Sequence, residues 1–353
     1  MSRRAYRAQG AGSSSVGLRG QARLALCILL VGIVAAPAGS RGEKPSARAD
    51  DGSAASPTLR LVSLVPEFLA LYREAEQEES RAQARAREEG RSLDPDTVAH
   101  IRRTIWERAM EPWSYRLARG ESVRWEAEDL ESAWARYARA MNGIRSAEGR
   151  VFSQAEDAFR EASRVLRLDR PLEVDLILYV GTFDEPPAFR LRNGSYTLLI
   201  PAEDLPTQLR PLFLDLFTRA LHARLGGRPP EGRLSLAQHL FLRGLALRVH
   251  EEVDPGQEAE SYLLRSRSWL LSAEQRDEAI ISGMKERLEE SDPERIERLR
   301  RGSGVSGLEG EFDFMAWRLS GLLLMDGWTL DRLARVPESE VAALVIETLS
   351  GRP

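Results

Sequence analysis

Apolar positions recur at helical spacing along much of the chain. One such series spans Leu61–Tyr72, and another runs from about residue 126 to 144. Ser153 and Glu156 have the spacing of a capping box, which predicts the start of a further helix at this point. Residues 59–168 are therefore expected to form a helical N-terminal region.

The pattern changes after Pro171. Residues Leu172–Val180 alternate and are apolar in their second half, which predicts a strand. Two further apolar runs, Ala188–Arg192 and Tyr196–Ile200, flank the dipeptide Asn193-Gly194, which is typical of a two-residue hairpin turn. We expect a small antiparallel sheet here, in a fold that is otherwise helical.

Helical patterns return after residue 206. The segment Leu209–Leu225 is apolar on most sides, as expected of a buried central helix, and Gly226-Gly227 should end it. Ser235 and Gln238 form a second capping box, which opens a helix through His250. Further helices are expected at about residues 257–270, 273–290, 312–326 and 330–349. The predicted fold class is α+β, predominantly helical.

The N-terminus has the organisation of a secretory signal. Five arginines precede the apolar run Leu24–Ala38, which ends in the small-residue pattern Ala36-Pro37-Ala38. Residues 1–38 are therefore predicted to be a signal peptide, and residues 39–58, rich in Gly, Ser, Ala and Pro, a flexible linker. The expected localisation is export to the periplasm or the extracellular space, and an uncleaved membrane anchor is the alternative.

The charge balance weighs against two classes of partner. Of 50 basic residues 48 are arginines, which is typical of GC-rich bacterial coding. Loss of residues 1–38 would leave 45 basic and 54 acidic residues, a net charge of −9. We therefore expect no nucleic-acid partner, and no membrane contact except through an uncleaved N-terminus. Cleavage would also remove Cys27, the single cysteine.

A hairpin, a buried helix, a loop and a second helix occur in that order. The first helix reads Leu214-Asp215-Leu216-Phe217-Thr218, and the second reads Leu242-Arg243-Gly244-Leu245-Ala246. This layout resembles the gluzincin fold of zinc metallopeptidases, and more narrowly a bacterial family of predicted zinc-dependent proteases. The resemblance covers about residues 170–350, so residues 169–353 are expected to form a metallopeptidase-like region with a small sheet followed by a helical core.

In such enzymes the first helix carries His-Glu-x-x-His, and the second supplies a glutamate as the third zinc ligand. The resemblance places Leu214 and Thr218 at the two histidine positions and Arg243 at the third-ligand position, while Asp215 stands where the general base would be. Leucine cannot donate to zinc, and arginine would bring a positive charge towards it. The chain is therefore identified as a degenerate member that lacks the metal ligands, and we expect no cofactor.

Two local arrangements are compatible with these replacements. Arg243 could take the place of the ion and form a bidentate pair with Asp215, or the two could be unrelated surface residues. Alternatively, Asp215, His222 and His239 could form a rearranged zinc site.

The expected function is that of an exported, non-catalytic pseudopeptidase that binds a peptide or a cell-envelope protein. One alternative is an active metallohydrolase with the rearranged metal site. Another is a structural helical protein of the envelope. Fold resemblance does not decide among these three, because function depends on the site rather than the scaffold.

Overall fold

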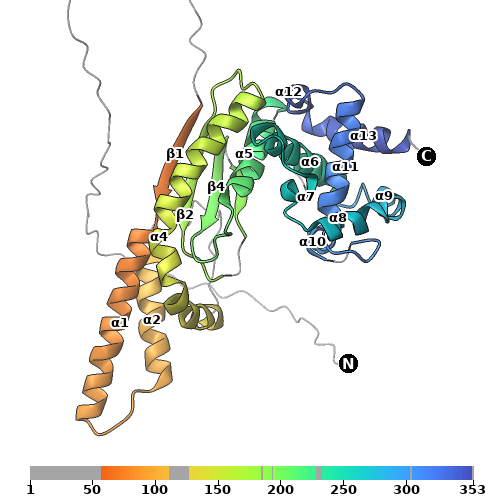
Figure 1. The fold of residues 1–353 in the computed structure, drawn as a ribbon. Coiled ribbons are helices and arrows are strands. Elements are labelled where there is room, and N and C mark those ends of the chain that lie inside the picture. Colours follow the sequence, from red (N-terminus) through yellow and green to blue (C-terminus); the bar gives the residue numbers. More distant parts are fainter. Residues whose placement is uncertain are drawn as a thin grey trace, which may run out of the picture. The chain divides into compact units, whose positions relative to one another are not determined.

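The fold is described here from a computed structural model, which covers residues 57–110, 127–183, 186–192, 194–227, 233–302 and 304–351. Residues Gly52–Pro353 form one compact unit, and all of the described residues belong to it. The predicted signal peptide and almost all of the predicted linker lie outside the described residues. The unit is α+β and predominantly helical, as predicted (Figure 1).

A four-stranded sheet forms the β part of the fold. Its strands are β1 (Thr58–Ser63), β2 (Glu173–Tyr179), β3 (Ala188–Arg192) and β4 (Ser195–Pro201), in the order β1-β2-β4-β3. The predicted hairpin is confirmed, because β3 and β4 pair antiparallel. The prediction of an antiparallel sheet is wrong, since β1 runs parallel to β2 and β2 runs parallel to β4. Helices connect β1 to its parallel neighbour β2, whereas β3 lies between β2 and β4 along the chain.

Strand β1 lies where the sequence predicted a helix. Its residues alternate in exposure over the first half of the strand, and Leu61 pairs in register with Leu176. The helix that follows, α1 (Val65–Glu88), has Pro66 in its first turn, where proline is tolerated. The series of apolar residues that begins at Leu61 therefore extends over two elements, the end of β1 and the start of α1. The local pattern did not indicate that residues 58–63 would pair with the distant strand β2.

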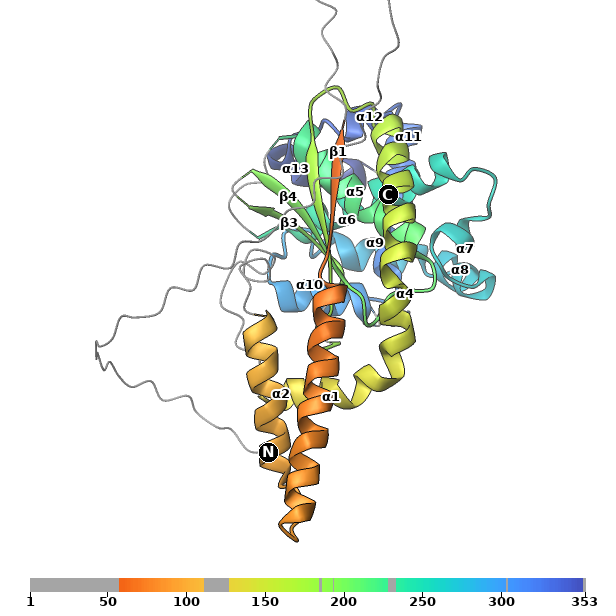
Figure 2. The ribbon, with the colours of Figure 1, turned by 90° about the vertical axis from the view of Figure 1, so that its left-hand side faces the viewer.

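Helices α1 and α2 (Pro95–Met110) pack side by side and extend beyond the sheet (Figure 2). Aromatic rings hold the base of α1 to helix α4 (Ala127–Val165): the centroids of Phe68 and Tyr137 are 4.9 Å apart. Arg102 links the same elements through ion pairs with Glu79 at 2.7 Å and Glu131 at 2.8 Å. The α1–α2 pair is therefore attached to α4 by both aromatic contacts and ion pairs.

Helix α4 is continuous over 39 residues, so the two helices predicted in this region are one. The predicted capping box at Ser153 is wrong. The Ser153 hydroxyl donates to the Gly149 carbonyl oxygen at 3.2 Å, which is the local bond that serine makes inside a helix. Sequence spacing alone does not separate this internal use of serine from a cap.

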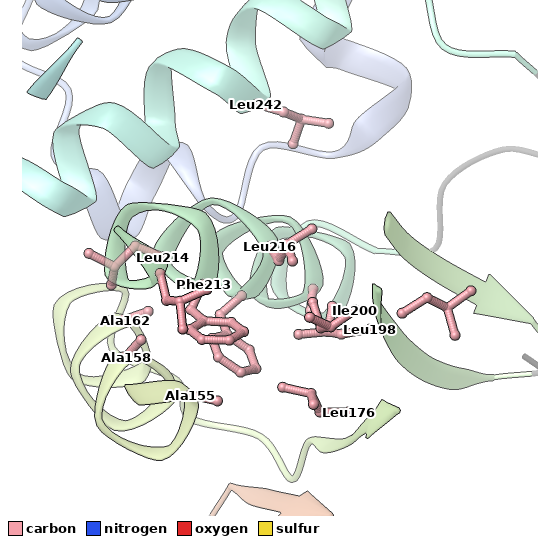
Figure 3. Packing of buried hydrophobic residues seen from close by; sticks show 14 of the residues in the cluster. Ala155, Ala158, Ala162, Leu176, Leu198, Ile200, Phe213, Leu214, Leu216 and Leu242 are labelled. Atoms are coloured by element: carbon pink, nitrogen blue, oxygen red, sulfur yellow. The ribbon is translucent and has the colours of Figure 1, made fainter. Parts of the chain in front are cut away.

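The core lies where α4, the sheet and α5 (Leu209–Leu225) meet. Small residues of α4 at helical spacing, Ala155, Ala158 and Ala162, are fully buried and face α5 (Figure 3). Without larger side chains between them the two helices can approach closely, and Phe213 fills the space beside the sheet residues of β2 and β4. Helix α5 has the bounds that its apolar run predicted, and Gly226 is its C-cap.

Helix α6 (Leu236–Val253) begins at the predicted capping box, in which the Ser235 and Gln238 side chains bond reciprocally. Seven further helices follow in the described residues; the one predicted at about 312–326 has nearly those bounds, and the other predicted helices are shorter or divided. The seven are α7 (Ala259–Tyr262), α8 (Arg267–Glu274), α9 (Asp277–Lys285), α10 (Pro293–Arg301), α11 (Glu311–Met325), α12 (Leu330–Leu333) and α13 (Glu338–Ser350). The sequence missed α10, and Pro337 divides the predicted helix 330–349 into α12 and α13. Among the described helices, none is both long and apolar enough to cross a membrane.

Candidate functional site

Helices α5 and α6 lie side by side, and α6 in turn packs closely on α11. Gly244 makes the second contact possible: a Cβ at this position would lie 2.4 Å from the Ala316 carbonyl oxygen. The Gly-Leu-Ala sequence of α6 therefore has a packing role in this chain. It also sets where the preceding residue, Arg243, stands between the three helices.

Arg243 bridges two aspartates from different helices. Its Nη1 lies 3.1 Å from Oδ1 of Asp215 on α5, and its Nε donates to Oδ1 of Asp313 on α11 at 2.7 Å. Asp215 also accepts from Arg219, one turn along α5, at 2.8 Å. The predicted ion pair between Arg243 and Asp215 is present, but the predicted bidentate geometry is wrong, because the guanidinium is shared with Asp313.

This cluster is mostly shielded from water, with its side chains 14% to 20% exposed. Burial disfavours the charged form of Asp215, but the positive charges of Arg219 and Arg243 outweigh it and lower its pKa to about 2. Burial likewise disfavours the charge on Arg243, and Asp313 and Asp215 more than offset this, so its pKa is raised. Asp215 is therefore a stable carboxylate and a weak base.

The other two predicted ligand positions lie apart from this pair. Leu214 is fully buried and points towards α4 (Figure 3). Thr218 is also fully buried, and its Oγ1 has no hydrogen-bond partner among the described residues. Arg243 forms its ion pair with Asp215 and not with Leu214 or Thr218. The residues present do not fit a zinc ion, because the set offers a leucine, a neutral hydroxyl and a cation.

The histidines that could form a rearranged site have other surroundings. His222 is 1% exposed, and its Nδ1 lies 3.3 Å from Oε2 of Glu338 at the start of α13. Burial and the charges of Arg219 and Arg300 lower the pKa of His239 to about 4. Within the described part of the chain, no three His, Cys, Asp or Glu side chains form a group that could hold a metal ion. Asp215, His222 and His239 do not form such a group among these residues.

These residues nevertheless share a pocket of about 620 Å³. Its walls come from the edge strand β3, from α5, α6 and α10, and from the first residue of α13. The polar side chains that line it include Asp215, Arg219, His222, His239, Arg300 and Glu338. Pro187, Phe189, Leu212, Leu216, Leu234 and Leu242 supply much of its apolar surface. The size and the mixed lining are typical of a ligand-binding pocket.

Sequence reasoning missed four members of the site: Arg219, Arg300, Asp313 and Glu338. Arg219 could have been found, because it stands four residues after Asp215 on the same helix, a spacing that favours ion pairs. Asp313 lies 70 residues from Arg243, and no local pattern connects them.

The sequence matches no protein-family model and no curated protein.

Replacing Arg243 tests how much the ion cluster contributes to the stability of the fold. Arg243→Met is expected to lower the free energy of unfolding by about 3 kcal/mol, because Asp215 and Asp313 would stay largely buried with fewer positive partners. Urea unfolding followed by circular dichroism measures the change. Arg295→Met, at an exposed ion pair on α10, is the matched control and should leave stability nearly unchanged. Equal losses in the two variants would contradict a structural role for Arg243.

Proposed function

We propose that this protein is an exported, non-catalytic pseudopeptidase that binds a peptide segment, for example of a cell-envelope protein, in the pocket beside β3. The observation that carries the proposal is the Asp215–Arg243–Asp313 bridge next to that pocket. It contains Arg243, at the position where the resemblance to zinc metallopeptidases would place the third metal ligand, and Asp215, at the general-base position. A guanidinium at a metal-ligand position supports a protein that keeps the cleft of a peptidase but does not carry out metal-dependent hydrolysis.

The charge state of Asp215 argues against hydrolysis. A general base works best when its pKa lies near the working pH, and the pKa of Asp215 is about 2. Its two oxygens are also engaged, one by Arg243 and the other by Arg219. A carboxylate in this state is poorly suited to take a proton from water.

An extended peptide suits the walls of the pocket. Strand β3 is at the edge of the sheet and pairs with β4 on one side only. Its residues Ala188, Phe189 and Arg190 line the pocket. The open side of an edge strand offers backbone groups that can pair with an added strand, and adjacent pockets can then select side chains.

The rearranged metallohydrolase and the structural envelope protein predict different results. The first needs metal bound by Asp215, His222 and His239, although Asp215 is held by two arginines and His222 by Glu338. The second needs no ligand in the pocket. A single set of binding, metal and cleavage measurements separates all three.

The test uses the mature protein and a pool of random-sequence octapeptides labelled with fluorescein at the N-terminus. We expect binding by fluorescence anisotropy, no cleavage of the pool, and far less than one zinc per chain by mass spectrometry after dialysis against trace zinc. Ser291→Trp, at an exposed residue that lines the pocket, should weaken binding about tenfold. Ser268→Trp, on the exposed surface of α8, should not.

About one zinc per chain together with metal-dependent cleavage would overturn the proposal in favour of an enzyme. An absence of binding to the pool would overturn it in favour of a structural role. Binding that is equally strong in Ser291→Trp would move the peptide site away from this pocket.

A further inference from the structure

Positive side chains line the pocket in excess, although the protein as a whole is acidic. The formal net charge of the chain is −4, and yet four arginines face the pocket from β3, the segment before α6, and helices α5 and α10, and His239 lines it from α6. These residues are Arg190, Arg219, Arg233, Arg300 and His239. A local excess of one sign inside a cleft attracts ligands of the opposite sign.

The carboxylates among the described lining residues do not balance these charges. Asp215 shares its single charge between Arg219 and Arg243. Glu338 is 4% exposed and lies behind His222, with one oxygen 3.3 Å from the imidazole Nδ1 and the other without a partner among the described residues. Arg300 has an ion pair with Glu297 on its own helix, at 3.2 Å between partly exposed side chains. The side of the pocket formed by Arg219 and Arg300 therefore keeps an excess of positive charge.

Arg219 and Arg300 lie close enough to repel each other and to disfavour protonation of His239. Burial and then the charge of Arg219 lower the pKa of Arg300, and both arginines contribute to lowering the pKa of His239. The Nδ1 atom of His239 is buried and has no hydrogen-bond partner among the described residues. An anion placed among these side chains would relieve the repulsion and could accept hydrogen bonds from all three.

We propose that Arg219, Arg300 and His239 form a carboxylate-binding site, so that the peptide is recognised through an acidic side chain or its C-terminal carboxylate. This inference rests on the proposed function and narrows its ligand class. Guanidinium groups suit a carboxylate because their N–H groups match its two oxygens. The partly buried position strengthens the attraction relative to the same groups on an open surface.

The test compares two pools of fluorescein-labelled octapeptides. Peptides of the acidic pool contain Asp or Glu and a free C-terminus, and those of the neutral pool contain Asn or Gln in their place and a C-terminal amide. We expect the wild-type protein to bind the acidic pool about tenfold more tightly. Arg300→Gln should reduce this preference to about equal binding, and Arg295→Gln, on the same helix but away from the pocket, should keep it.

His239→Asn is a second variant that should also reduce the preference, and circular dichroism verifies the fold of each variant. Equal binding of the two pools by the wild-type protein would overturn the carboxylate site and leave the peptide-binding function intact. A preference that survives in both pocket variants, or that falls equally in Arg295→Gln, would also overturn it. Failure of both pools to bind would overturn the proposed function itself.

Discussion

Replacing Glu311 by alanine should lower the free energy of unfolding by about 4 kcal/mol, because three partly buried backbone N–H groups would lose their acceptor. Glu311 is fully buried at the start of α11. It accepts from the backbone N–H groups of Val305 at 2.6 Å, Ser306 at 2.9 Å and Leu308 at 2.7 Å, and from the Ser306 hydroxyl. The segment 304–308 is thus attached to the core by one carboxylate.

Urea denaturation at neutral pH measures this effect. Glu311→Gln keeps one acceptor oxygen and should fall between the wild-type protein and Glu311→Ala. Glu309→Ala is the matched control, because the Glu309 side chain is 73% exposed two residues away. Equal stability of Glu311→Ala and Glu309→Ala would show that the loop does not depend on the buried carboxylate.

Lowering the pH should destabilise the wild-type protein through His239. Burial and the charges of Arg219 and Arg300 hold its folded-state pKa at about 4, against 6.5 for the free side chain. Between these values the unfolded chain binds a proton that the folded protein does not, so stability falls as the pH decreases through this window. The full loss is about 3 kcal/mol, complete near the folded-state pKa.

Unfolding free energies measured by urea denaturation across this window provide the test. His239→Gln has no proton to take up, so its stability should fall less than that of the wild-type protein as the pH is lowered. Arg300→Gln removes one of the two cations that act on His239, and its pH dependence should lie between the other two. Parallel profiles for the wild-type protein and His239→Gln would refute the assignment.

Local sequence signals were sufficient for several elements. Helix α5 carries an apolar run with glycines after it, and α6 begins with a capping box whose two bonds both form. The β3–β4 hairpin follows from two short apolar runs around a turn dipeptide, although Asn193 itself lies outside the described residues. In each case the sequence pattern and the interactions that it predicts involve residues near one another in the chain, so a short stretch of sequence is enough to predict the element.

Other elements depend on contacts that no short window contains. Thr58–Ser63 becomes a strand because β2, more than 100 residues later, offers it a parallel partner. Ser153 has the spacing of a cap, but α4 continues through it because its alanines pack against α5. Tertiary packing overrides local preference in both places.

The candidate site divides in the same way. The sequence indicated Asp215 and Arg243 as possible partners, since they stand at related positions of two successive helices, 28 residues apart. It did not indicate Asp313, whose carboxylate competes for the same guanidinium and removes the bidentate geometry. Nor did it indicate that Arg300 would lie near Arg219 and His239, because α10, which carries Arg300, was not predicted.

By itself, the sequence determined the helical α+β character, the limits of α5, the start of α6 and the hairpin, because caps, turns and apolar periodicity act between neighbouring residues. The tertiary structure alone decided the parallel strands, the shared guanidinium of Arg243 and the cationic pocket. These depend on which side chains of distant segments meet, and the charges and burial that result exist only once the helices are packed together.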